Sequence, residues 1–218
     1  HRSSFTTMAS PKSTVMAGLG LFTLGYGVVM FTNSHNQLVV LTALLFGIVL
    51  GEWWQIEEGL RRVGVWLESV VMRGSAEGGD NRFVRGFLTA SLVFCVGPMA
   101  ILGSIEDGLT GNYKTLAVKS VLDGFGALAF ASTLGVGVLF SALMILLYQG
   151  GLSLLAAQAQ AGLTPAMMAE MTAAGGIIML AISIGSLLEI RPIRSGNFLP
   201  ALLLAPLLVL VFQAFGIY

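Results

Sequence analysis

Long apolar stretches separated by short polar segments are the feature that most limits how this chain of 218 residues can fold. A helix needs about 20 mostly apolar residues to cross the hydrocarbon core of a bilayer, which is about 30 Å thick. Five stretches meet this requirement, at residues 14–31, 37–54, 83–103, 171–188 and 197–215. The sequence therefore predicts an all-α, polytopic transmembrane helix bundle, organised as a single domain over residues 1–218.

A sixth apolar block covers residues 121–163 and is too long for one span. Glycine pairs at 124/126 and 135/137 and the run Gln149-Gly150-Gly151 interrupt it. We interpret the block as two helices, about 119–137 and 138–159, which makes about seven spans with glycine-broken central helices. The alternative is one long tilted helix followed by a short re-entrant piece, which is tolerated only where protein or water covers the break.

The composition restricts the class of protein. The chain is 56% hydrophobic and only 10% charged, whereas about 25% of the residues of a soluble domain are charged. Eleven basic residues balance eleven acidic ones, so no basic field exists to attract nucleic acid. A soluble globular enzyme, a disordered chain and a nucleic-acid-binding protein are therefore excluded, and the lipid bilayer is the expected partner.

Candidate ligands for a cofactor are scarce. Cys95 is a lone cysteine, and His1 and His35 have no metal-ligating neighbour at a useful spacing. The motifs of serine hydrolases, zinc proteases, nucleotide phosphate loops and dinucleotide-binding sites are also missing from the sequence. We expect no cofactor and no enzymatic activity, and the sequence identifies no metal.

Basic residues predict the orientation, because Lys and Arg accumulate on cytoplasmic loops. With the N-terminus inside, all but two of the eleven basic residues lie on the cytoplasmic side. The exceptions are Lys114 and Lys119. This unequal distribution favours an N-terminus in the cytoplasm.

Residues 52–73 differ from the spans and form a predicted amphipathic helix. Apolar side chains recur there at steps of three and four residues, which places them on one face: Trp53, Ile56, Leu60, Val63, Leu67 and Val70. The pairs Glu57–Arg61 and Glu58–Arg62 have the spacing of ion pairs on a helix surface. We expect this helix to lie on the membrane or on the bundle at the cytoplasmic side, followed by a flexible loop at 74–82.

Ionisable and polar groups between the third and fourth spans are the candidate site. Asp123 is the first candidate, because a charge inside an apolar run costs several kcal/mol and is usually paired or functional. Lys119 lies four residues earlier and can pair with it. The other candidate ligands carry carboxylate, hydroxyl or amide oxygens: Asp107, which is expected either at an outer mouth or in an ordinary exposed turn, and Ser104, Ser120, Ser132 and Gln149.

Two further acidic residues are expected to play lesser roles. Glu170 precedes the predicted span at 171–188, where a helix N-terminus favours an acid in any case. Glu189 follows that span and is expected to pair with Arg191 and Arg194 as a cytoplasmic anchor.

Glycine is abundant, with 28 residues in the chain. Small residues let helices approach closely in a membrane, and Gly47-x-x-x-Gly51 is one such pattern. The same glycine-rich faces also suit a homodimer. A faint likeness between the first two spans and the last two indicates an internal repeat, which is frequent in transporters.

The run from residue 85 to residue 150, which contains GSIEDGLTGNYKTLAVKSVLDGFG, resembles a bacterial membrane family of unknown function. This is the YqgA/YdfK-like family, or domain of unknown function 554. The likeness extends to GLGLFTLGYGVVM, LLFGIVLGEW, MTAAGGIIMLAISIG and GNFLPALLLAPLL. The resemblance implies a multi-pass protein of the bacterial inner (plasma) membrane, with one more glycine-rich span before His1, for a total of eight. Transport is supposed for the family, which supplies no substrate and no agreed functional residues.

Two functions remain open from the sequence. The first is a transporter or channel for a small solute or a cation, with its acidic site at Asp123. The second is a membrane scaffold or accessory subunit that docks partners through the helix at 52–73.

Overall fold

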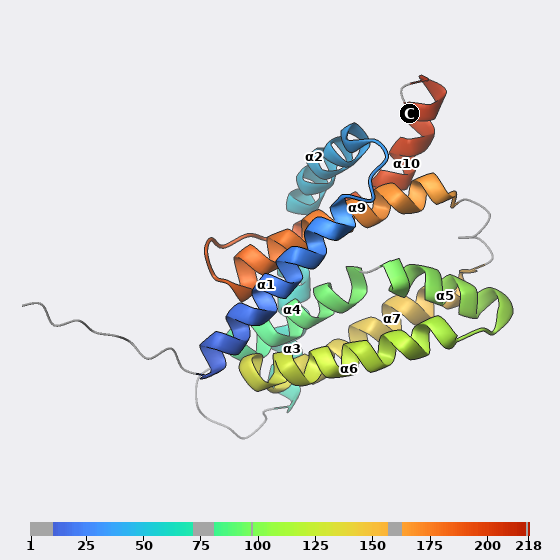
Figure 1. The fold of residues 1–218 in the computed structure, drawn as a ribbon. Helices are drawn as coiled ribbons and strands as arrows, with labels where there is room; N and C mark the ends of the chain where they lie inside the picture. The colour runs from blue at the N-terminus through green and yellow to red at the C-terminus, as the bar shows by residue number, and fades with distance from the viewer. Residues whose placement is uncertain (1–10, 72–80, 97, 157–162, 217) are drawn as a thin grey trace, which may run out of the picture.

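The computed structural model describes residues 11–71, 81–96, 98–156, 163–216 and 218. Every regular element in these residues is helical, which confirms the predicted all-α class. The α-helices are α1 (Pro11–Phe31), α2 (Gln37–Trp54), α3 (Ile56–Val71), α4 (Asn81–Val96), α5 (Pro98–Thr110), α6 (Lys114–Leu134), α7 (Ser141–Leu154), α9 (Pro165–Ile182) and α10 (Pro200–Ala214) (Figure 1). Three short 3₁₀ or π segments join them, namely η1 (Val136–Phe140), η2 (Ser183–Leu187) and η3 (Ser195–Phe198).

Within the described residues, six helices are long and apolar enough to cross a bilayer, and the pair α4–α5 makes a seventh if it counts as one span. The predicted number of about seven is therefore the upper of these two values. The six are Ser13–Phe31, Gln37–Trp54, Lys114–Leu134, Val136–Leu154, Pro165–Leu187 and Ser195–Ala214. The chain is a multi-pass membrane protein.

The third predicted span, residues 83–103, is not one straight helix. Helices α4 and α5 are bent by 77° relative to each other. Pro98, the first residue of α5, has no N–H to donate to a carbonyl of α4, which favours a kink or break at this point. Because α5 continues to Thr110, the turn predicted around Asp107 is also wrong.

The block at 121–163 divides close to where the sequence predicts. Helix α6 ends at Leu134, and Gly135 adopts a positive φ of 83° that a side chain would oppose. The alternative of one long tilted helix is therefore wrong. Gly124 and Gly126 do not break α6, and the predicted break at Gln149 is wrong because this residue lies inside α7.

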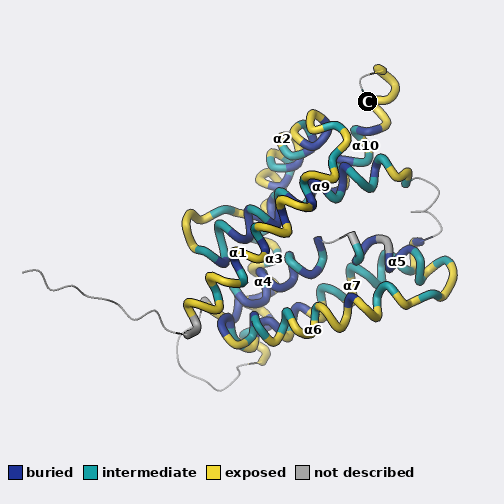
Figure 2. Tube along the Cα trace, in the orientation of Figure 1, coloured by how far each residue is buried: buried dark blue, intermediate teal, exposed yellow. Residues whose placement is uncertain are grey.

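The spans form two groups that pack against each other. The outer group consists of α1, α2, α9 and α10, with α1 packed on α9 and α2 on α10. The central group consists of α4 to α7 and joins the outer group through contacts of α1 with α6 and of α4 with α9 (Figure 1). Helix α9 is the most buried of the six candidate spans, whereas α6 and α7 bury the smallest shares of their residues, as Figure 2 shows. Their exposed apolar faces suit contact with lipid.

Glycine brings the helices of the outer group together. A side chain on Gly51 of α2 would overlap the backbone of Asn197, and one on Gly176 of α9 would meet the backbone of Gly27 in α1. The structure thus confirms that Gly47-x-x-x-Gly51 is a packing motif, because Gly47 lies against Ala201 of α10.

Helix α3 is the predicted amphipathic helix, but it begins at Ile56, since α2 continues to Trp54 and Gln55 takes a left-handed φ of 52°. Gly64 and Leu67 are buried, with Gly64 against Val84 and Phe87 of α4, so the helix lies on the bundle. The last two residues of the loop predicted at 74–82 are helical, because α4 starts at Asn81; the rest of that predicted loop lies outside the described residues.

One of the two ion pairs predicted in α3, Glu58–Arg62, is confirmed. Glu58 pairs with Arg61 at 2.7 Å and with Arg62 at 3.6 Å. The hydrogen bond with Arg61, together with the charges of both arginines, lowers the pKa of Glu58, and the bond with Glu58 raises the pKa of Arg61. The predicted pair Glu57–Arg61 is wrong, because the Glu57 carboxylate accepts a hydrogen bond from the N–H of Gly196 instead.

Candidate functional site

A cavity of about 350 Å³ lies between the two helix groups, walled by α1 and α9 on one side and by α4, α5 and α6 on the other. Its lining includes six aromatic and thioether side chains, from Phe22, Tyr26, Phe94, Phe130, Met99 and Met179. Phe22 is 74% exposed and Leu122 is 57% exposed, so the cavity opens sideways between α1 and α6. A small amphiphilic molecule could be enclosed there.

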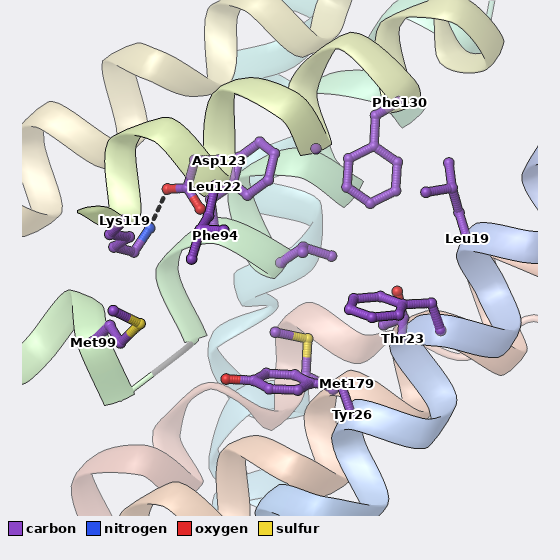
Figure 3. A pocket seen from close by; sticks show the side chains of 13 residues that line it. Leu19, Thr23, Tyr26, Phe94, Met99, Lys119, Leu122, Asp123, Phe130 and Met179 are labelled. Atoms are coloured by element: carbon purple, nitrogen blue, oxygen red, sulfur yellow. Dashed lines mark hydrogen bonds and ion pairs between the residues drawn. The ribbon is translucent and has the colours of Figure 1, made fainter. Parts of the chain in front are cut away.

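The charged wall of the cavity is the pair Lys119–Asp123 on α6 (Figure 3). The Lys119 ammonium donates to Oδ2 of Asp123, which confirms the predicted pairing. The side chain of Lys119 is 7% exposed and that of Asp123 is 24% exposed. Two ions on an apolar wall lose most of their hydration, and their mutual attraction has to offset that cost.

The register of α6 explains why both charges face the cavity. Residues 119, 122, 123, 126 and 130 line it, and their spacing of three or four places them on one face of the helix. Gly126 leaves room on this face of α6, since a side chain there would come within 3.3 Å of the Phe94 ring. Thr23 and Tyr26 of α1 add hydroxyl groups on the opposite wall, as Figure 3 shows.

The three serines predicted as ligands do not reach this cavity. Ser104 is buried in α5 and donates to the carbonyl of Ala100. Ser120 and Ser132 are exposed and donate to carbonyls of their own helix. The hydrogen of each of these hydroxyls is already bonded to a carbonyl of the same helix, a common local arrangement for serine in helices.

Asp107 and Gln149 are also placed away from Asp123. Asp107 is half-buried near the end of α5 and does not line the cavity. Gln149 lies in α7, and its Nε2 is buried with no hydrogen-bond partner among the described residues. The structure thus brings together Asp123 and Lys119 of the predicted set, and separates the other five.

Sequence reasoning underrated Glu170, which is fully buried. Thr164 caps α9, and Pro165 occupies its first turn, so the helix starts six residues earlier than predicted and contains Glu170. The Thr164-Pro165 dipeptide is the signal that could have shown this. Four donors surround the carboxylate: the Ser34 hydroxyl at 2.7 Å, the N–H groups of His35 and Asn36 at 2.8 Å each, and the Tyr218 hydroxyl at 3.0 Å.

This arrangement ties three parts of the chain together at one end of the bundle. The loop between α1 and α2 and the C-terminal Tyr218 both bind the same carboxylate of α9. Partial burial, together with the adjacent Glu170, raises the pKa of Tyr218 to about 12.

A similar arrangement exists at the opposite end. The Glu57 carboxylate accepts the N–H of Gly196 at 2.8 Å, and the N–H of Glu57 donates to Oδ1 of Asn197 at 2.8 Å. Burial raises the pKa of Glu57, although the hydrogen bond from Gly196 opposes this rise. Helix α3 is thereby fastened to the loop that precedes α10.

Arginines gather at this second end, which the charge distribution predicts to be cytoplasmic. Arg85 pairs with Glu189 and also donates to the carbonyl of Ser186, while Arg194 pairs with Glu52 at 3.2 Å. The predicted partnership of Glu189 with Arg191 and Arg194 is therefore wrong. Helix α4 brings Arg85 to Glu189, a contact between residues more than 100 positions apart.

No group of three or more His, Cys, Asp or Glu side chains that could hold a metal ion occurs in the described part of the chain. The cavity itself presents one carboxylate and two hydroxyl oxygens. Its chemistry is that of a charged pair in an apolar, aromatic environment.

Residues 6–210 match the model of a family described as a protein of unknown function, DUF554. The chain belongs to this family. It is 30% identical to the uncharacterized membrane protein YdfK of Bacillus subtilis over 207 residues, covering 93% of this chain and 85% of that protein. It is 31% identical to the uncharacterized protein YqgA of Escherichia coli over 186 residues, covering 85% and 79% of the two chains. No solved structure matches the chain.

Family membership confirms the resemblance deduced from the central segment. It also agrees with a multi-pass membrane protein, because the Bacillus relative is named as a membrane protein. Neither relative's name states an activity, so the case for a function rests on the cavity.

Proposed function

We propose that this protein carries a small solute or a cation across the membrane, and that the solute binds in the cavity at Lys119–Asp123. The observation that supports this most is a charged pair on the wall of a cavity that otherwise consists almost entirely of apolar side chains. Ionisable groups in a span are expensive and face cavities or partners, which makes them markers of a transport path.

The position of the cavity supports the same function. It lies at the boundary between the outer and central helix groups, with α1 and α9 on one wall and α4 to α6 on the other. In many transporters the site lies between two such units, and a small movement of one against the other changes which side is open. The bend between α4 and α5 borders the cavity, since Phe94 and Met99 line it from the two sides of that bend.

The test is flux through purified protein in liposomes, with a panel of cations and small solutes, for the native chain beside Asp123→Asn. We expect flux of at least one solute, reduced at least about tenfold in the variant, which loses the charge that pairs with Lys119. Asp107→Asn is the matched control, because it removes an acid of α5 that lies outside the cavity. Equal flux in native protein and in a folded Asp123→Asn variant would contradict the proposal.

A second function is supported by the exposed tryptophans. Trp53 at the end of α2 is 77% exposed and Trp66 of α3 is 60% exposed, beside the arginine-rich end of the bundle. We propose, as the alternative, that α3 docks a partner protein and that the chain acts as a scaffold or accessory subunit. A stoichiometric partner that co-purifies with the native chain and is lost in Trp53→Ala/Trp66→Ala would favour this alternative over transport.

A further inference from the structure

The charges that face the cavity cancel. Lys119 and Asp123 line it together, and the other polar groups of its lining, Thr23 and Tyr26, are neutral hydroxyl groups. Addition of a cation or an anion alone would leave one uncompensated charge in a region of low dielectric constant, where such a charge is costly. A guest that carries one charge of each sign leaves the total at zero.

The ion pair has hydrogen-bonding capacity left. A carboxylate has two acceptor oxygens and an ammonium has three donors. The bond between Lys119 and Asp123 uses Oδ2 and one N–H, and among the described residues no other partner is found for this carboxylate. Asp123 is also the more exposed of the two charges, with 24% of its side chain accessible against 7% for Lys119. A guest ammonium can therefore approach Asp123 from the cavity side.

The remaining lining selects an apolar group. Rings of Phe22, Tyr26, Phe94 and Phe130 surround the space, together with the flexible thioethers of two methionines. Aromatic faces attract an ammonium ion as well as apolar surface, and methionine adapts to irregular shapes. By contrast, Mg²⁺ or Ca²⁺ requires about six or more oxygen ligands, and the lining offers those of one carboxylate and two hydroxyls.

We propose that the cavity binds a zwitterion with an apolar remainder, whose ammonium group contacts Asp123 and whose acidic group contacts Lys119. This inference rests on the proposed function and narrows its substrate class from a small solute or cation to a zwitterion. The same chemistry occurs in a free amino acid with an apolar side chain and in a zwitterionic lipid headgroup. The sideways opening between α1 and α6 admits either source.

Binding is measured by thermal shift of the full chain in an uncharged maltoside detergent, with three matched probes. Leucine carries both charges, isopentylamine lacks its carboxylate, and 4-methylpentanoate lacks its ammonium. We expect leucine to raise the Tm with an affinity at least about tenfold higher than either analogue. Phosphatidylethanolamine, with phosphatidylglycerol as the matched anionic lipid, tests the lipid source in the same assay.

Two variants link the binding to the ion pair. Lys119→Met/Asp123→Asn removes both charges at once, which a folded protein tolerates better than the loss of one partner. We expect this double variant to keep the native Tm and to lose the response to the zwitterion. The exchanged pair, Lys119→Asp/Asp123→Lys, keeps the cavity neutral and is expected to restore part of the response.

The outcomes separate this inference from the proposed function. Stronger binding of leucine or of phosphatidylethanolamine than of the singly charged probes supports the zwitterion and identifies its source. Flux of a cation that depends on Asp123, without a response to either zwitterion, overturns the inference and leaves the transport function standing. Equal responses in the native chain and the double variant overturn the assignment of the cavity as the binding site.

Discussion

Two acidic side chains inside candidate spans, Asp123 and Glu170, behave in opposite ways. Glu170 of α9 is fully buried and receives hydrogen bonds from four donors in two other segments of the chain. Asp123 of α6 is partly exposed to a cavity and receives one hydrogen bond, from Lys119 of its own helix. An acid whose oxygens are saturated by fixed donors holds the fold together, whereas one with capacity left can bind a guest.

A loop also binds a second glutamate, Glu57, but the carboxylate of Glu57 accepts one hydrogen bond, from the N–H of Gly196. Ser34-His35-Asn36 precedes α2 and binds Glu170, and Ser195-Gly196-Asn197 precedes α10 and binds Glu57. The first loop is bound by a glutamate of α9 in the outer group, and the second is bound by a glutamate of α3. The internal repeat that the sequence indicates between the first two and last two spans stays a prediction.

The largest effect on stability is expected from Glu170→Gln. Oε1 of Glu170 accepts the N–H groups of His35 and Asn36, and Oε2 accepts the Ser34 hydroxyl, so a glutamine can keep an oxygen at the first position but places an NH₂ donor against Ser34 and removes the negative charge from every one of these bonds. Loss of charge-assisted hydrogen bonds at a buried site costs on the order of 3 kcal/mol. Thermal unfolding in detergent measures the change, with Asp107→Asn as the control. An unchanged Tm would show that the two acids do not differ as described.

A smaller loss of stability, about 1–3 kcal/mol, is expected for Gly51→Ala. A methyl group there would overlap the backbone of Asn197 and push the loop that binds Glu57 away from α2. Gly25→Ala in α1 is the matched control, since no atom lies within 4 Å of the position that its side chain would occupy. If both variants unfold at the same temperature, close packing does not hold this loop.

Removal of the whole charged pair in Lys119→Met/Asp123→Asn should change the free energy of unfolding by less than about 1 kcal/mol, because neutral replacement of both partners avoids an unpaired charge. The same unfolding measurement, made beside Glu170→Gln, checks this directly. A loss as large as that of Glu170→Gln would make the pair structural, and the distinction between the two acids would fail.

The smallest effect is expected from pH at Glu57. Burial raises its pKa above the ordinary 4.5, and Glu52 and Glu58 add to this rise, while the bond from Gly196 and the charge of Arg194 oppose it. The folded protein therefore binds the proton more tightly than the unfolded chain does. Its contribution to stability is present below pH 4.5 and is lost as the pH rises through the raised pKa.

Because solvent screens this half-buried group, the change is expected to stay below about 1 kcal/mol. The melting temperature measured against pH should fall across this interval in the native chain and less steeply in Glu57→Gln, whose amide oxygen still accepts from Gly196. Identical slopes would show that Glu57 does not titrate in this interval.

The sequence by itself determined the class of protein, the approximate spans, the pairing of Lys119 with Asp123 and the glycine motif at Gly47 and Gly51. All of these depend on hydropathy and on neighbours within one or two helical turns, which local order along the chain controls. The boundaries that failed, at Pro98 and at Pro165, carried a local signal in proline that hydropathy alone concealed.

Only the tertiary structure decided which polar groups meet. Ser34 and Tyr218 converge on Glu170, Arg85 reaches Glu189, and α1 closes the cavity over Asp123, all between residues far apart in the chain. The physical reason is that a carboxylate in a span looks the same in the sequence whether its oxygens are saturated or free. Its role depends on the donors that packing brings to it from other helices.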